Sequence, residues 1–163
     1  MPLVAGPGAQ QKVGDANLRE ERGQELVKKL VALADVLVEN FKPGTLEKWK
    51  LGPDDLHAVN PGLVISRVSG FGQTGPYADR PGFASVGEAM GGLRYINGFP
   101  GQPPPRNGIS LGDTLTGLFA AQGVLMALYW RDARGGGKGQ VIDAAITESC
   151  FSMMESALPE FDK

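Results

Sequence analysis

Residues 63–72, LVISRVSGFG, decide the fold of this chain. Their apolar and β-branched side chains predict a strand, and the glycines that follow predict its abrupt end. A similar run, DVLVEN at 35–40, comes earlier, and two short helical segments separate the two runs. A strand, helices and a second strand in this order form a βαβ unit, for which parallel pairing is the rule. We therefore predict an α/β fold built on a parallel sheet with flanking helices.

Further segments extend this pattern toward both ends of the chain. Residues 17–34 place apolar residues at helical spacing among charges, which predicts an amphipathic helix. Residues 114–131 are apolar nearly all round, so we expect a helix buried in the core. Residues 140–146, QVIDAAI, predict a further strand or extended segment, and residues 147–158 predict a last amphipathic helix. The glycines of GGGKGQ at 135–140 predict a helix stop, because the Ser or Thr of a phosphate-binding loop is missing after the lysine.

The composition excludes several classes of function. With 163 residues and a formal net charge of −2, the chain offers no broad basic surface for nucleic acid. Its one cysteine excludes an intramolecular disulfide, and with a single histidine it argues against a Cys/His zinc site, so we expect no metal. The longest apolar run, 115–130, is shorter than the roughly 20 residues of a membrane span, and we expect no membrane partner. A reducing compartment fits, and we expect a cytoplasmic protein.

A single carboxylate, Asp113, stands at the start of the apolar segment SLGDTLTGLFAAQG at 110–123. One interpretation is a helix cap, in which the carboxylate accepts backbone N–H bonds at the positive end of the helix dipole. The other is a nucleophile, which must be ionised, partly desolvated and open to substrate. Gly112 beside it permits close approach, because it carries no side chain. The residues alone leave both interpretations open.

The first strand ends in the segment ENFKPG, which places Asn40 and Phe41 where open α/β sheets bind their ligands. Lys48 and Trp49 follow one short helix later. An aromatic ring with a nearby cation suits a nucleotide that carries phosphates. A tryptophan in the core and a solvated lysine are an equally good account of the second pair.

Four segments occur in the order and rough spacing of the class III CoA-transferases: ADVLVENFKPGTLEKWKLG, NPGLVISRVSGFGQTGPYADRPGF, LGDTLTGL and GKGQVIDAAITES. The chain resembles this family over residues 18–161. The family includes formyl-CoA and carnitine CoA-transferases, with α-methylacyl-CoA racemases as relatives. The resemblance implies that residues 18–163 form a partial Rossmann-like domain, a fragment of the class III CoA-transferase fold, after an irregular N-terminal remnant at 1–17. Because members of the family are much longer, we expect a chain shortened at both ends.

The resemblance implies that Asp113 is the catalytic aspartate. Its carboxylate would carry CoA from an acyl-CoA to a carboxylic acid through a covalent aspartyl intermediate. The CoA thioester is then a substrate, and no permanently bound cofactor is expected. The matching positions also imply CoA contacts, which are Val4, Ala5, Asn40, Phe41, Lys48, Trp49 and Phe83.

Two alternatives to a transferase stay open. A racemase has a catalytic histidine where this chain has Phe83, so the resemblance argues against racemisation. Ala84 departs from the acidic residue often found next, so the acceptor acid is not specified. The shortened chain is also compatible with an inactive interaction module, and an exposed sheet edge predicts a homodimer or other self-association.

Overall fold

The computed structural model of the chain describes residues 14–155 and 159–160. Its strands form a parallel sheet in the order β1–β2–β3, which confirms the predicted α/β class. The bounds are Val36–Glu39 for β1, Val64–Ser69 for β2 and Val141–Ala145 for β3. In the register Glu39 lies beside Arg67, and Ser69 lies beside Ala145. The carboxyl ends of the strands therefore meet at one end of the sheet.

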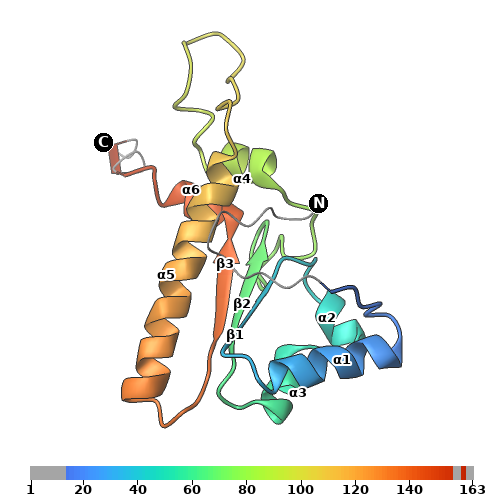
Figure 1. The fold of residues 1–163 in the computed structure, drawn as a ribbon. Helices are drawn as coiled ribbons and strands as arrows, with labels where there is room; N and C mark the ends of the chain where they lie inside the picture. Colours follow the sequence, from blue (N-terminus) through green and yellow to red (C-terminus); the bar gives the residue numbers. More distant parts are fainter. Residues whose placement is uncertain (1–13, 156–158, 161–163) are drawn as a thin grey trace.

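Helices lie on both sides of this sheet (Figure 1). On one side are α1 Glu21–Val31, α2 Thr45–Lys48 and α3 Pro53–Val59. On the other side α5, Leu111–Ala133, packs against β2 and β3. Two short helices, α4 Ala84–Met90 and α6 Ile146–Phe151, cross near the start of α5. The long segment between α4 and α5 extends away from the sheet (yellow in Figure 1), as its many glycines and prolines predict.

The larger core lies between the β1–β2 face and helices α1 to α3. Alternation along β2 explains which residues enter it, because Leu63, Ile65 and Arg67 point to one face and the residues between them to the other. Burial of each leucine there stabilises the folded state by about 1.5–3 kcal/mol relative to an exposed leucine. The buried members of this core are Val31, Leu46, Leu51, Leu56, Leu63 and Ile65.

A smaller core joins α4, α5 and α6. It contains Leu93, Ile146 and Cys150, with Leu111 and Leu115 of α5 packed against them. Cys150 is fully buried, as expected of a small apolar residue. Burial, together with the nearby charges of Glu88 and Asp113, raises the pKa of its thiol. This core fixes the end of α5 at which Asp113 lies.

The expectation that α5 is buried all round is wrong. Thr116, Ala120 and Ala127 face the sheet and are buried. Small side chains on this face let the helix axis come close to the sheet, so its bulky residues are left on the outer side. More than half of each of the following side chains is exposed: Leu118, Leu125, Met126, Tyr129 and Trp130.

The length of α5 also corrects the sequence analysis. The helix has 23 residues, so by length and composition alone it meets the criterion for a membrane-crossing helix. The apolar run at 115–130 is shorter than the helix, because the helix also includes the polar residues that flank this run. A core helix of a soluble protein meets the same criterion. In the described structure one side of α5 packs on the sheet.

Two glycine-to-alanine changes test the packing of β2, β3 and α5. A Cβ at Gly139 would overlap the backbone carbonyl of Leu63, so Gly139→Ala should lower the free energy of unfolding by roughly 2 kcal/mol or more. A Cβ at Gly117, inside α5, meets nothing within 4 Å. Gly117→Ala should raise stability by about 0.5–1 kcal/mol, since alanine favours the helix. Urea unfolding measures both, and equal effects would contradict the packing described.

Candidate active site

Four of the predicted site residues, Asn40, Phe41, Phe83 and Asp113, lie toward the carboxyl end of the sheet. β1 ends at Glu39 and β2 at Ser69, while α5 begins near the same end and runs back along the strands (Figure 1). Asn40 and Phe41 follow β1 directly, and Phe83 precedes α4. Open α/β sheets bind ligands at this end of their strands. The fold therefore places Asp113 on the same side of the molecule as three predicted CoA contacts, which are Asn40, Phe41 and Phe83.

A cavity of about 240 Å³ lies between the segments that follow β1 and β2. Asn40, Phe41 and Phe83 line it, together with the cationic residues Lys42 and Arg80. The structure thus brings together three of the residues predicted to contact CoA. Positive charge beside two aromatic rings gives this cavity the chemistry that a nucleotide or an acyl carboxylate needs.

Two glycines form one wall of the cavity by close backbone contact. A Cβ at Gly70 would lie 2.5 Å from Gly82 Cα, so neither position has room for a side chain. Both residues line the cavity. The segment after β2 is therefore held against the segment before α4, and Phe83 is presented at the cavity rim with most of its side chain exposed.

Lys48 and Trp49 are placed differently from each other. The Trp49 ring meets the Phe41 ring edge-on, with centroids 5.4 Å apart and an interplanar angle of 82°. It also packs against the larger core, so the core interpretation is correct in part. Lys48 lines a separate cavity of about 540 Å³, whose other cationic residues are Arg19, Lys28 and Lys50. Trp49 is thus joined to the first cavity through Phe41, whereas Lys48 lines a second cavity that Glu21 and Glu25 line as well.

Asp113 lies in the first turn of α5 and is exposed. The helix begins at Leu111, three residues earlier than predicted, so Asp113 is inside the helix rather than before it. The N-cap residue Ser110 makes no side-chain capping bond. The macrodipole at this end favours a negative charge. The carboxylate is therefore held by its helix and open to solvent.

Gly112, the residue before Asp113, is held by contacts with α4 and α6. Gly112 is buried and its N–H donates to Glu88 Oε1 at 3.3 Å. A Cβ at Gly112 would lie 3.1 Å from Ile146 Cγ2 and 3.3 Å from the Ala84 carbonyl oxygen. Since Ala84 adjoins Phe83, this packing ties the start of α5 to the rim of the cavity.

Two other carboxylates near the site differ from Asp113 in accessibility or bonding. Glu88 is 1% exposed, so a substrate cannot reach it. Its Oε2 lies 3.8 Å from Arg94 Nε. Asp143 Oδ2 accepts the Gln73 N–H at 2.8 Å and so holds the loop after β2. Among these three carboxylates, Asp113 is the exposed one that takes part in no hydrogen bond of the described structure.

Some predictions find no test in this part of the chain. Val4 and Ala5 lie outside the described residues. Across residues 14–155 and 159–160, no group of three or more His, Cys, Asp or Glu side chains is arranged to hold a metal ion.

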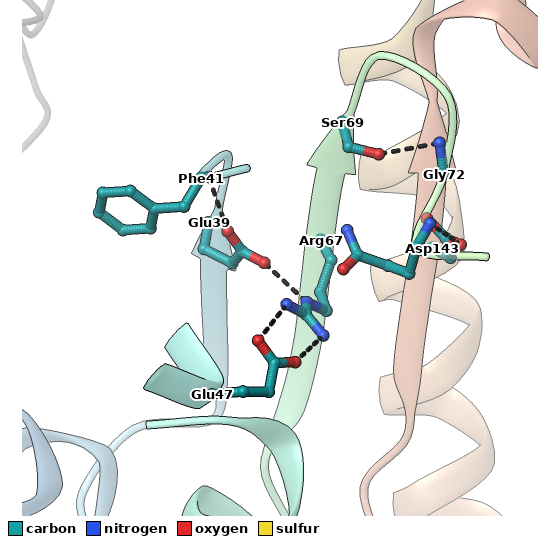
Figure 2. Close-up of polar contacts among 8 residues, drawn as sticks. Glu39, Phe41, Glu47, Arg67, Ser69, Gly72 and Asp143 are labelled. Atoms are coloured by element: carbon teal, nitrogen blue, oxygen red, sulfur yellow. Dashed lines mark hydrogen bonds and ion pairs between the residues drawn. The ribbon is translucent and has the colours of Figure 1, made fainter. Parts of the chain in front are cut away.

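The sequence analysis missed a buried arginine at the site. Arg67 lies in β2, and its Nε donates to Glu39 Oε1 at 2.7 Å (Figure 2). Its Nη1 and Nη2 donate to Glu47 Oε1 at 2.7 Å and Oε2 at 3.3 Å. We call Arg67, Glu39 and Glu47 the Arg67 triad. The signal that could have revealed it is an arginine inside a strand that is otherwise buried, because such a charge requires partners.

The charges of the triad stabilise one another. Burial opposes the charge of Arg67, but the hydrogen bonds to Glu47 and Glu39 and the negative charges of these two carboxylates together outweigh that effect and raise its pKa. Burial likewise opposes the charge of Glu47, but the hydrogen bond from Arg67, a backbone hydrogen bond and the positive charge of Arg67 together outweigh it and lower the pKa of that carboxyl. Both groups are charged at neutral pH.

The fold and the site define an α/β protein that presents its polar and aromatic site residues where parallel strands end. A model of CoA-transferase family III matches residues 11–161. The chain belongs to this family.

Several relatives give the match more detail. The chain is 57% identical over 145 residues to the succinyl-CoA–D-citramalate CoA-transferase of Chloroflexus aurantiacus, a match that covers 89% of this chain and 36% of that protein. It is 49% identical over 146 residues to the succinyl-CoA–L-malate CoA-transferase beta subunit of the same organism, again with 89% and 36% covered. The chain thus spans little more than a third of the length of these curated relatives.

Solved structures show the same relation. A CAIB/BAIF family protein from Brucella suis superimposes with a TM-score of 0.84 at 39% sequence identity. The match covers 91% of this chain and 39% of that chain. The predicted class III CoA-transferase fold is confirmed.

The lowered pKa of Glu47 predicts how stability depends on pH. A carboxyl with a lowered folded pKa adds stability above its unfolded pKa of about 4.3, and this is lost as pH falls through the folded value. Glu47→Gln removes that contribution. The melting temperature of the parent protein should therefore exceed that of Glu47→Gln at neutral pH, and the difference should shrink below about pH 4. A difference that stays constant with pH would contradict the assignment.

Proposed function

We propose that this chain transfers CoA from an acyl-CoA to a carboxylic acid, with Asp113 as the nucleophile. The observation that carries the proposal is the place of Asp113, exposed in the first turn of α5 at the end of the sheet where Asn40, Phe41 and Phe83 line a cavity. Membership of CoA-transferase family III supports the reaction type.

The reaction follows from the carboxylate as covalent catalyst. Asp113 attacks the thioester carbonyl and expels CoA thiolate, which leaves a mixed anhydride of the acyl group and the aspartate. The thiolate attacks the aspartyl carbonyl, forms an aspartyl-CoA thioester and releases the donor acid. The acceptor carboxylate then attacks this thioester and releases the thiolate again. Attack of the thiolate on the new anhydride yields the acceptor's CoA thioester and regenerates the Asp113 carboxylate.

The surroundings of Asp113 suit these steps. The positive end of α5 favours the ionised carboxylate that the first attack requires. Lys42 and Arg80 place positive charge at the cavity, where the phosphates of CoA or an acid substrate would bind. Backbone N–H groups of the glycine segments around Gly70 and Gly82 are candidates to stabilise the oxyanions that form during each attack.

The names of the relatives indicate which substrates to try first. Two of them are transferases that use succinyl-CoA, one with D-citramalate and one with L-malate. We propose that the donor is the CoA thioester of a small dicarboxylic acid and that the acceptor is a hydroxy acid of similar size. Lys42 and Arg80 at the cavity offer partners for the second carboxylate.

Replacement of the nucleophile tests the proposal. Asp113→Asn keeps the size of the side chain but removes its negative charge, so transfer should fall about a thousandfold or more. Hydroxylamine added with acyl-CoA should convert the aspartyl thioester to a hydroxamate, which mass spectrometry would find at Asp113. Asp132→Asn, at the opposite end of the same helix, should leave transfer unchanged. A label on Asp143 would assign the chemistry to another carboxylate.

The racemase alternative has a separate readout. Phe83 at the cavity rim has no group that accepts a proton, so this position cannot exchange the α-hydrogen of an acyl-CoA. Incubation of a chiral α-methylacyl-CoA in deuterated water should leave the α-carbon unlabelled. Deuterium at that carbon would reject the transferase proposal.

We also propose that the chain self-associates through the outer side of α5. Leu125, Met126 and Tyr129 are mostly exposed there, and exposed apolar surface of this kind favours contact between proteins. Leu125→Asp should shift the molar mass measured by light scattering toward the monomer. A parent protein that is already monomeric at the same concentration would contradict this proposal without bearing on Asp113.

A further inference from the structure

The Arg67 triad joins three separate elements of the chain. Arg67 comes from the middle strand, Glu39 from the end of β1 and Glu47 from α2. Glu39 and Arg67 are nearly completely buried, whereas the Glu47 side chain is 43% exposed. One planar guanidinium thus sets the position of two carboxylates that belong to different segments.

Each carboxylate is close to a residue proposed to bind CoA, Glu39 through a hydrogen bond and Glu47 along the chain. Glu39 Oε2 accepts the backbone N–H of Phe41 at 2.7 Å (Figure 2). Glu47 lies two residues before Trp49. The rings of Phe41 and Trp49 then meet edge-on, 5.4 Å apart. These contacts, with the chain itself joining Trp49 to Glu47, form a closed circuit that begins and ends at Arg67.

Stability alone does not account for a charge at this place in β2. Burial of an ion pair costs so much desolvation that apolar residues of similar volume are often as stable or more so. The neighbouring residues that face the same core are Leu63 and Ile65, so an apolar side chain would suit position 67. The property that an arginine adds is a fixed geometry between two carboxylates.

We propose that Arg67 is a positioning residue for the CoA site. By holding Glu39 and Glu47 it sets the separation of residues 39–41 from residues 45–49, and so presents the Phe41 and Trp49 rings in a binding-ready arrangement. Ligand binding then needs no further ordering of these two side chains. The inference rests on the proposed function, because it assigns the triad to the site that would bind CoA.

The direct test is Arg67→Lys, which keeps the charge but not the fork that reaches two carboxylates. Glu47→Gln is the second variant, because its half-exposed side chain can change without leaving a buried charge unpaired. Each should raise the Kd for CoA, measured by titration calorimetry, about tenfold, the loss expected when two side chains must be ordered on binding.

The control is Asp35→Asn. It removes a carboxylate from another arginine pair, Asp35 with Arg131 at 3.0 Å, at the opposite end of the sheet. CoA affinity should not change in this variant. The second readout is the fluorescence of Trp49 without ligand, measured in a Trp130→Phe background so that Trp49 is the one tryptophan left. Its emission should shift in Arg67→Lys and Glu47→Gln and stay constant in Asp35→Asn.

The outcomes separate this inference from the proposed function. Parent and variants that bind CoA equally well would overturn the positioning role and leave the transferase proposal standing. A parent protein that binds no CoA would count against the proposed function, and the Trp49 emission would then decide the positioning role by itself. If both variants melt earlier but keep the parent Kd and emission, the triad is structural and the inference is wrong.

Discussion

β2 lies between β1 and β3, and parallel pairing on both sides is the constraint from which the rest of the structure follows. Because the three strands run the same way, the segments that leave them emerge at one end of the sheet. The connection from β2 to β3 must return to the opposite end, and α5 makes that return. The start of α5, and with it Asp113, is therefore carried to the strand ends where Asn40 and Phe41 lie.

The two cores stabilise different elements at the carboxyl end of the sheet. The larger core supports β1, β2 and the α2 segment, so it carries Phe41 and Trp49. The smaller core supports α4, α5 and α6, so it carries Asp113 and Phe83. Close contact between Gly70 and Gly82 joins the segment after β2 to the segment before α4. A molecule that bridges Phe41 and Asp113 would thus span parts of the chain that are stabilised separately.

Local patterns were sufficient to predict the sheet, and the family resemblance selected most of the candidate site residues. The β-branched runs around Val36 and Val64 identify strands because few other structures favour them, and the parallel order follows from the helices between them. Phe41 could be selected because it follows a predicted strand directly. The residues around Asp113 left a helix cap and a nucleophile both open, and the family resemblance selected the nucleophile. The glycines after α5 also end the helix as predicted, with Gly136 and Gly137 at positive φ.

Features that depend on distant contacts could not be predicted in this way. The apolar count along α5 is the same whether one side or all sides are covered, so the exposure of Leu125 and Tyr129 needed the position of the sheet. The Arg67 triad links residues 20 and 28 positions apart, and no local pattern contains that pairing. The helix α4 was missed because it is short and carries a glycine at 87, whereas close packing of Gly87 against Ile146 of α6 fixes it in the structure.

The contact between Gly70 and Gly82 has a consequence for how such a cavity adapts over evolutionary time. That part of its wall is made by main-chain atoms, whose position does not depend on which side chains surround them. Residues on the other walls, Phe83 and Arg80 among them, are free to vary in size and charge while the frame keeps its dimensions. Single substitutions on those walls can therefore change what the cavity accepts, without rebuilding the main-chain frame.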